Sequence, residues 1–211
     1  MSRCLICDEV IEDNFNSILF GNKSICVKCF KSLEIRNDKF IIDGVEGVIL
    51  YAYNQFFKDL IFKYKGCGDY ALKDVFLHYK LPKLKRKYRG YDVVCAPSNK
   101  DSELKRGFSH VEEMIKGLNL KIIRCFKKTK QWKQSNKHLE ERANIQNIIK
   151  IDKVTLKGVS KVLLVDDILT TGSTIKTMIR QLPTNIDKKV LIIASNCRIV
   201  HRQIIWNNIK K

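Results

Sequence analysis

The stretch Val162-Leu163-Leu164-Val165-Asp166-Asp167-Ile168-Leu169-Thr170-Thr171-Gly172-Ser173-Thr174-Ile175 decides the fold of this 211-residue chain. It starts with four consecutive apolar residues, and such a run without polar alternation is typical of a strand buried on both faces of a parallel sheet. Two acids, a hydroxyl-rich turn with one glycine, and apolar residues at helical spacing follow, up to Pro183. The stretch therefore predicts a central strand, an acidic end, a tight turn and a helix.

The turn between this strand and this helix predicts a phosphate site beside two acids. A glycine-containing turn at a helix N-terminus directs unpaired backbone N–H groups and the positive end of the helix dipole at one point. Asp166 and Asp167 lie at the carboxyl end of the strand, where ligands bind in open α/β sheets, and can accept sugar hydroxyls or hold a hydrated Mg²⁺. The pattern is neither a Walker loop nor a G-x-G-x-x-G fingerprint. The alternative is a buried strand whose polar end only caps a helix.

Residues 165–174 resemble the phosphoribosyl-pyrophosphate (PRPP) motif of the type I phosphoribosyltransferases. The resemblance implies that the paired acids contact the ribose hydroxyls, that the turn holds the 5′-phosphate and that Mg²⁺ accompanies PRPP. The PRPP-binding candidates are Asp166, Asp167, Thr170, Thr171, Gly172, Ser173 and Thr174. No catalytic residue is assigned.

Outside this motif, strands and helices alternate through the last two-thirds of the chain. Strands are expected at residues 47–53, 91–97, 122–126 and 189–195, and helices at 55–64, 71–79 and 111–118. Alternation of this kind predicts an α/β fold with a mostly parallel, doubly wound sheet and right-handed crossovers. We expect residues 41–211 to form this phosphoribosyltransferase-like domain.

Two C-x2-C pairs near the N-terminus predict a zinc module over residues 1–40. Cys4 and Cys7 form one pair, Cys26 and Cys29 the other, and the spacing matches a structural four-cysteine Zn²⁺ site. Gly21-Asn22 is a hairpin turn signal between the pairs. Disulfides are one alternative and are disfavoured by the missing signal peptide. A redox motif is the other and is disfavoured because neither pair opens a helix after a long strand. The remaining four cysteines, Cys67, Cys95, Cys125 and Cys197, are expected to be small buried hydrophobes.

Three further segments narrow the resemblance to the ComF group of DNA-uptake proteins. Residues 62–69 are similar to the F-x-Y-K-x-x-G-D segment of the group, which implies a binding role for Lys63 or Lys65; an exposed helix end is the alternative. Residues 105–108 resemble the start of its R-G-F-N-Q signature, with Ser109-His110 in place of Asn-Gln. Residues 127–145 are similar to the hood loop that closes over PRPP; a plain disordered loop is the alternative.

The loop after the strand at residues 91–97 is long and charged, which is typical of a functional loop. In phosphoribosyltransferases the corresponding loop meets the pyrophosphate, so Ser98, Lys105 and Arg106 join the lysines as pyrophosphate candidates. His110 has no partner at a metal-ligand spacing and is expected to be a helix cap or a surface residue.

The composition predicts attraction to polyanions. Lys and Arg number 40 against 22 Asp and Glu, which gives a formal net charge of +18. The nucleic-acid candidates are the basic run with Lys83, Lys85, Arg86 and Lys87, together with Tyr88 and Trp132 as stacking faces. The alternative is a solvated basic surface. No stretch of eighteen apolar residues and no signal peptide is found, so we expect a cytoplasmic protein without a transmembrane segment.

The resemblance to the ComF group implies a PRPP-binding, zinc-containing protein that takes part in the uptake of single-stranded DNA. Its expected partners are PRPP, single-stranded DNA and a competence helicase, which would bring it to the inner face of the membrane. One alternative is a phosphoribosyltransferase that transfers the ribose phosphate of PRPP to an unknown acceptor. Another is a basic nucleic-acid-binding module whose PRPP motif has lost its ligand.

Overall fold

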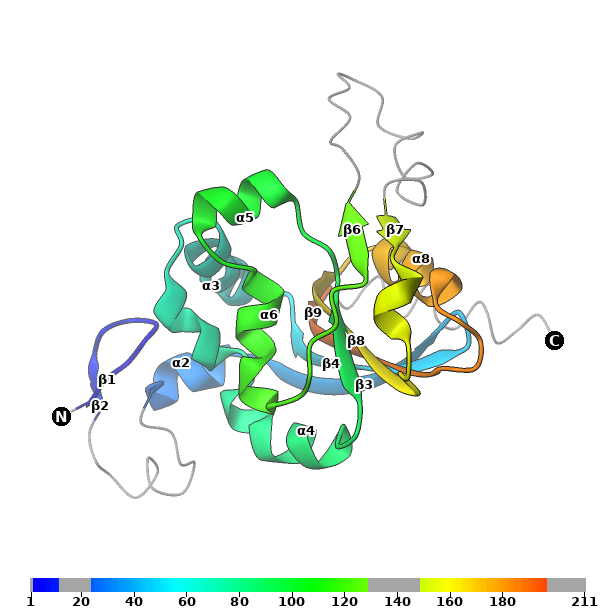
Figure 1. Cartoon of the computed structure of the whole chain (residues 1–211). Helices are drawn as coiled ribbons and strands as arrows, with labels where there is room; N and C mark the ends of the chain where they lie inside the picture. The colour runs from blue at the N-terminus through cyan, green and yellow to red at the C-terminus, as the bar shows by residue number, and fades with distance from the viewer. Residues whose placement is uncertain (1, 12–23, 129–148, 197–211) are drawn as a thin grey trace.

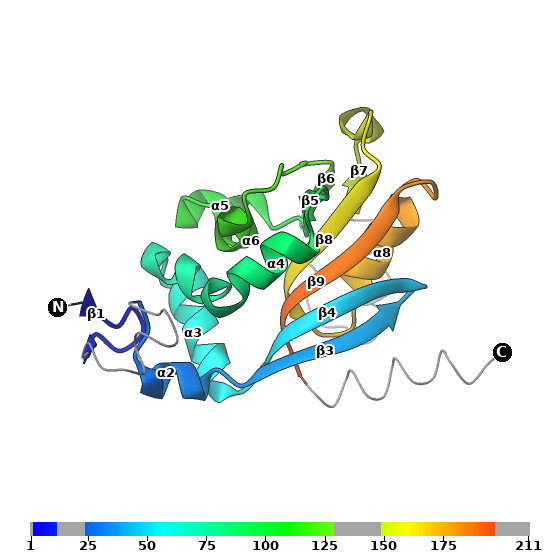
Figure 2. The same cartoon turned by 90° about the horizontal axis from the view of Figure 1, so that it is seen from below.

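The computed structural model describes residues 2–11, 24–128 and 149–196. Its centre is a five-stranded sheet in the order β3-β4-β9-β8-β5 (Figures 1 and 2). The strands are β3 (Ile35–Ile42), β4 (Val45–Ala52), β9 (Asp187–Ser195), β8 (Lys161–Leu169) and β5 (Asp92–Cys95). β3 and β4 are antiparallel, whereas β4, β9, β8 and β5 run parallel. The expected α/β fold with a mostly parallel sheet is therefore confirmed.

Helices cover both faces of this sheet. α8 (Ser173–Gln181) packs on one face, and α3 (Gln55–Lys65), α4 (Leu81–Lys87) and α6 (His110–Ile115) lie on the other (Figure 2). The alternation of side chains along each strand divides the core accordingly. Leu163, Val165 and Leu191 pack with the α3 side, which we call the first core, and Leu164 and Val190 pack with the α8 side, the second core.

The deciding stretch folds largely as its sequence predicts. Val162 to Val165 are 0% exposed, as expected of a strand buried on both faces. The strand does not end at the acids, however, because β8 continues to Leu169 and remains paired with β9 up to Ser195. The two carboxylates are thus held by a hydrogen-bonded strand.

The long loop expected at residues 98–110 is wrong in part, because it contains helix α5 (Lys100–Arg106). Asn99 caps its N-terminus by accepting a hydrogen bond from the backbone N–H of Asp101, and Gly107 ends it with a φ of 82°. Acidic residues in the first turn and basic residues in the last complement the helix dipole. These local signals stabilise a short helix within a charged segment.

Other elements differ in kind from the prediction. Residues 71–79 form 3₁₀ turns, η1 (Tyr70–Val75) and η2 (His78–Lys80), and the basic run after them is helix α4. Instead of a strand at residues 122–126, Ile122 makes a single bridge with Val93, and β6 (Phe126–Lys128) pairs with β7 (Ile149–Ile151). Further 3₁₀ turns are η3 (Lys116–Leu118) and η5 (Lys153–Leu156).

The N-terminal part is small and packs on the domain. It has the paired strands β1 (Ser2–Arg3) and β2 (Val10–Ile11) and helix α2 (Val27–Ser32), beside α3 in Figure 2. The hairpin expected at Gly21-Asn22, Trp132, most of the expected hood loop and Cys197 lie outside the described residues. Within the described ranges, no helix is long and apolar enough to cross a membrane.

Candidate functional site

Asp166 and Asp167 lie on β8, and the alternation of the strand turns them to opposite faces of the sheet. Two positions earlier on the strand, Val165 packs with the α3 side and Leu164 with the α8 side. Asp167 accordingly contacts Lys65 of α3 and His110 of α6, and the alternation of the strand assigns Asp166 to the α8 side. The hydroxyl-rich turn leads directly into α8. Asp166 therefore shares its side of the sheet with the turn, and Asp167 does not.

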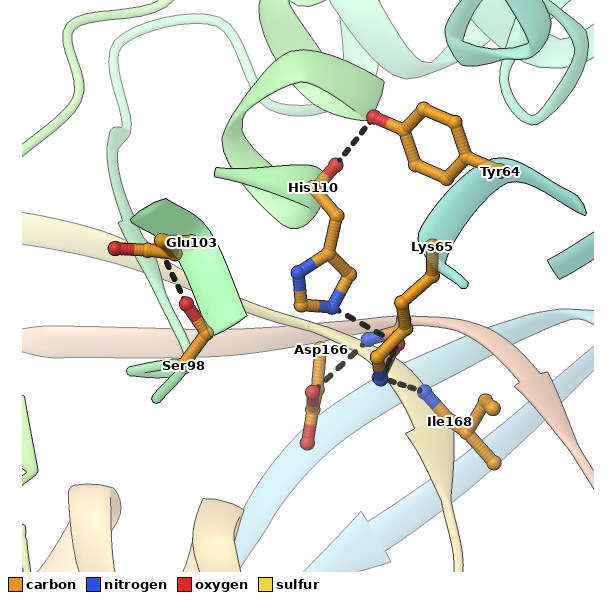
Figure 3. Close-up of polar contacts among 8 residues, drawn as sticks. Tyr64, Lys65, Ser98, Glu103, His110, Asp166 and Ile168 are labelled. Carbon is orange, nitrogen blue, oxygen red and sulfur yellow. Dashed lines mark hydrogen bonds and ion pairs between the residues drawn. The ribbon is translucent and has the colours of Figure 1, made fainter. Parts of the chain in front are cut away.

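Asp167 is held by three protein groups from separate segments (Figure 3). Its Oδ2 atom lies 2.8 Å from Lys65 Nζ at the end of α3 and 3.0 Å from His110 Nε2 at the start of α6. Its Oδ1 atom accepts the backbone N–H of Ile168 at 2.8 Å. Asp167 is only 6% exposed, and its carboxylate holds the side chains of Lys65 and His110 in place through these two contacts.

The pKa values of the two acids are displaced in opposite directions. Burial alone would raise the pKa of Asp167, but the hydrogen bond from His110 and the charge of Lys65 outweigh it and hold the pKa well below the usual range. The pKa of Asp166 is raised, first by desolvation and then by the neighbouring Asp167 charge. Asp166 Oδ1 accepts the backbone N–H of Asp167 at 2.9 Å (Figure 3). A cation beside Asp166 would offset the raised pKa and stabilise the carboxylate.

The expectation that His110 is a cap or a surface residue is wrong. His110 is 4% exposed, and Ser109 is the N-cap of α6. Tyr64, which is fully buried, donates its hydroxyl to the backbone carbonyl of His110 at 2.8 Å. Burial lowers the pKa of His110, although Asp167 opposes the effect. The neutral imidazole then donates from Nε2 to Asp167, and its buried Nδ1 atom has no hydrogen-bond partner within the described part of the chain.

The turn after β8 brings hydroxyl and backbone N–H groups to the start of α8. Gly172 adopts a φ of 74° directly before α8, a left-handed conformation that favours glycine. The hydroxyls of Thr171 and Ser173 lie 2.8 Å apart, and the Ser173 N–H points at Thr171 Oγ1 at 3.4 Å. Thr170 is exposed, and Thr171, Ser173 and Thr174 are partly exposed. Hydroxyl and N–H donors are therefore gathered at the N-terminus of a helix.

The pyrophosphate candidates after β5 are arranged around α5. Ser98 hydrogen-bonds the Glu103 side chain (Figure 3), so its hydroxyl is engaged within the protein. Lys105 is exposed, and the guanidinium of Arg106 lies over the Phe108 ring at 5.6 Å. Arg106 Nε is buried and lacks a hydrogen-bond partner among the residues that the structure describes. A buried donor without a partner costs about 1–3 kcal/mol, which a bound anion would offset.

The two lysine candidates on α3 differ in their surroundings. Lys65 contacts Asp167, whereas Lys63 is exposed and makes no side-chain hydrogen bond or ion pair among the described residues. A pocket of about 410 Å³ lies beside Lys65 and Ile168, and Tyr53, Ile61 and Phe62 contribute to its wall. The wall is largely apolar, so the pocket suits a flat or apolar group next to the site of the acids.

The four predicted metal ligands come together. The Sγ atoms of Cys4, Cys7, Cys26 and Cys29 all lie within 4.8 Å of one another, so the cluster can hold a metal ion. The Cys26 N–H points at Cys4 Sγ at 3.3 Å, and the Cys29 N–H points at Cys26 Sγ at 3.5 Å. Burial alone would raise the pKa of the Cys4 thiol, but such backbone N–H groups lower it to about 7. These contacts stabilise the Cys4 thiolate, whereas burial and the neighbouring cysteines raise the pKa of Cys29.

Two predictions about isolated side chains fail. Tyr88 is 1% exposed and is not a free stacking face. Cys67 is exposed, because it lies between Gly66 and Gly68 in the turn after α3. Cys125 is buried as expected and Cys95 is partly buried. The basic residues of α4, by contrast, are exposed: Lys83, Lys85, Arg86 and Lys87.

Sequence comparisons find similarity to a phosphoribosyl transferase domain and to a competence protein. A family model described as a phosphoribosyl transferase domain matches residues 104–206. The competence protein ComFC of Streptococcus pneumoniae (strain ATCC BAA-255 / R6) is 35% identical over 133 residues, which are 63% of this chain and 59% of that protein. The chain therefore aligns with less than two-thirds of the length of this relative.

Solved phosphoribosyltransferases are more distant. Adenine phosphoribosyltransferase from Saccharomyces cerevisiae is 15% identical, with a TM-score of 0.41 over 82% of this chain and 88% of that chain. A hypoxanthine phosphoribosyltransferase from Staphylococcus aureus is 20% identical, with a TM-score of 0.35 over 63% and 67%. These two likenesses identify no substrate. The family model shows that residues 104–206 match a phosphoribosyl transferase domain, and the chain is similar in sequence to the competence protein ComFC.

Proposed function

We propose that this chain is a ComF-type protein that binds PRPP with Mg²⁺ and takes part in the uptake of single-stranded DNA. One observation carries the proposal: Asp166 is on the same face of the sheet as the hydroxyl-rich turn, whereas Asp167 is on the opposite face and is bound there by Lys65 and His110. A carboxylate on the same side as a turn rich in hydroxyl and N–H donors suits a sugar phosphate with its metal ion. The competence relative supports a role in competence, and we propose that this role is the uptake of single-stranded DNA in the cytoplasm with a helicase partner.

Different residues would bind different parts of PRPP. Asp166 would hold Mg²⁺ and the ribose hydroxyls, and Asp167 would act through Lys65 and His110. Thr170, Thr171, Gly172, Ser173 and Thr174 would bind the 5′-phosphate through hydroxyls and backbone N–H groups. For the pyrophosphate we propose Arg106, whose buried Nε lacks a partner among the described residues, together with Lys105, Ser98 and Lys63. Mg²⁺ supplies charge neutralisation of the phosphates.

We infer that the cysteine cluster holds a structural Zn²⁺. Four sulfur ligands leave no open position for a catalytic water, and N–H groups directed at the sulfurs fit a thiolate site. The cluster is packed into the first core through Cys4 and Cys29. Zinc would therefore stabilise the α2 region and contribute to the fold.

Single-stranded DNA is proposed to bind along α4. Its four basic side chains are exposed, whereas Leu84 of the same helix is buried against the core. An exposed basic helix attracts phosphates without reading the sequence of bases. Tyr88 is withdrawn from this role because it is buried.

The second candidate function is transfer of the ribose phosphate to an acceptor. The pocket of about 410 Å³ beside Lys65 favours it, because the pocket offers room for an acceptor at the carboxyl end of β8, where Ile168 lines it. Calorimetry with PRPP, with and without Mg²⁺, tests the shared part of both functions, and absence of Mg²⁺-dependent binding would refute both. Release of pyrophosphate in a screen of nucleobases and amines, with PRPP present, would favour the transferase.

A further inference from the structure

A second cavity lies at the opposite end of the sheet from the acids. It has a volume of about 560 Å³ and is lined by the starts of β4 and β9, by β3 and by the segment after α4. Asp166 is near the carboxyl end of β8, whereas Gly47 and Lys189 are near the amino ends of parallel strands. The cavity is therefore separate from the proposed PRPP site, and it shares Lys87 with the DNA-binding helix α4 proposed above.

The register of the sheet explains which side chains surround this cavity. Lys39 pairs with Val48, and Val48 pairs with Leu191, so these three residues form one row across β3, β4 and β9. In the next row on the same face, Ile41 pairs with Glu46, and Lys189 of β9 lies beside Glu46. Both rows project to the face of the first core. At this end of the sheet the apolar floor ends in a rim of charged residues.

The charge of the cavity is positive. Lys39, Lys87 and Lys189 line it, and the one acid in the lining, Glu46, is paired with Lys189 at 2.7 Å. Desolvation, followed by the charges of Lys39 and Lys189, lowers the pKa of Lys87. Like charges held this close favour a bound anion, because it would offset their repulsion.

The walls of the cavity are aromatic and aliphatic. Tyr91 is partly exposed and its hydroxyl donates to Asp187 at 2.6 Å, so its ring is fixed in place. Val48 is partly exposed at the floor, and Ile41 is 47% exposed at the edge. The volume of about 560 Å³ lies within the range of small-ligand sites. A flat apolar group fits the wall while its charged part reaches the lysines.

We propose that this cavity binds a nucleoside phosphate, with the base against Tyr91 and Val48 and the phosphate between Lys39 and Lys87. A planar base and an anion joined by a sugar match an apolar wall with a lysine rim. The ligand is either a free nucleotide or one nucleotide of a single strand, and both present the same chemistry. In the second case the strand would continue from the cavity onto α4, which Lys87 ends.

The test measures binding of dAMP by calorimetry and of a labelled oligothymidylate by fluorescence anisotropy. Val48→Trp fills the floor without changing any charge, and Tyr91→Ala removes the wall, whereas Tyr91→Phe keeps the ring. We expect Val48→Trp and Tyr91→Ala to weaken binding at least about tenfold, in line with the stacking of a base on an aromatic ring, and Tyr91→Phe to change it little. Lys39→Gln should weaken binding more than Lys31→Gln, a matched loss of one exposed lysine on α2.

The outcomes separate the sources of the ligand. If the Val48→Trp and Tyr91→Ala substitutions weaken the binding of dAMP, the cavity is a site for a free nucleotide. If they weaken only the binding of the oligonucleotide, the cavity holds one nucleotide of a single strand. The proposal is overturned if neither probe binds, if both bind the folded Val48→Trp and Tyr91→Ala variants as they bind the parent, or if PRPP displaces dAMP competitively. Oligonucleotide binding that depends on α4 but not on these variants would leave the proposed DNA role standing and remove only the cavity.

Discussion

At the scale of single residues, two adjacent acids have different environments because a strand alternates its side chains. Asp166 faces the turn, whereas Asp167 binds Lys65, His110 and the Ile168 N–H behind it. The sequence predicts that both acids belong to the site, and the alternation could also have predicted that they face opposite sides. It could not predict the partners of Asp167, because these lie 102 and 57 residues away in the chain.

We predict that Asp166→Asn impairs the binding of PRPP and that Asp167→Asn impairs the stability of the fold. Asp166→Asn should weaken Mg²⁺-dependent PRPP binding at least about tenfold, because it removes the charge facing the metal, and should leave unfolding unchanged or slightly improved. Asp167→Asn should lower the free energy of unfolding by about 1–3 kcal/mol, because the buried His110 loses the charged oxygen that accepts its hydrogen bond. Calorimetry and urea unfolding measure the two effects. Equal effects of both substitutions on stability would contradict the assignment.

We also predict that the two partners of Asp167 contribute unequally to stability. The side chain of His110 is 5% exposed and that of Lys65 is 43% exposed, although both bind the same oxygen. His110→Phe should cost about 1–3 kcal/mol in urea unfolding, because a buried acceptor loses its donor. Lys65→Met should cost under about 1 kcal/mol, because water solvates the exposed partner. A larger loss for Lys65→Met would show that the ion pair, and not His110, holds the carboxylate.

At the scale of elements, local sequence signals predicted the long strands well and the short helices poorly. β8 and β9 each contain an apolar run, residues 162–165 and 190–194, so the burial of these runs is evident from the sequence. α5 has no buried residue, and its stability comes from the Asn99 cap and the Gly107 C-cap rather than from an apolar stripe. A search for apolar periodicity alone cannot find such a helix, whereas a search for caps can.

The cysteine cluster gives a prediction about the element it fixes. We expect one Zn²⁺ per chain by elemental analysis, and we expect a strong chelator to lower the thermal midpoint, because Cys4 and Cys29 are part of the first core. Cys7→Ser should reproduce this loss, while Cys67→Ser, an exposed cysteine outside the cluster, serves as the control. Freshly purified protein without zinc, whose four thiols titrate freely, would refute the assignment.

Helix α4 gives the prediction about DNA. Replacing Lys83, Lys85, Arg86 and Lys87 together with Gln should weaken binding of single-stranded DNA and flatten its salt dependence by roughly 0.7 per lost phosphate contact. PRPP binding should persist, since the turn that would hold that ligand lies after β8. Anisotropy titrations at several salt concentrations measure the slope. An unchanged slope in the quadruple variant would show that α4 is only a solvated surface.

At the scale of the whole molecule, the sequence predicted the class of fold, the cysteine cluster and the pair of acids before the hydroxyl-rich turn. It did not predict the order of the strands or the cavity at the far end of the sheet. The sheet order, the pairing of β4 with β9 and the cavity between β3, β4 and the end of α4 depend on contacts between residues far apart in the chain. The net charge of +18 favours polyanions in general. Only the fold shows that three lysines gather around an apolar wall.

The pairing of β4 with β9 also has a consequence for synthesis on the ribosome. The β3–β4 hairpin leaves the exit tunnel before β9, but Gly47 pairs with Val190, so the β9-facing side of β4 lacks this partner until β9 has been translated. During that interval an apolar strand presents open hydrogen-bonding groups to the cytosol. Nascent chains that stall before residue 187 should therefore be sensitive to proteases and dependent on chaperones, and the sheet should close only when the last strand emerges.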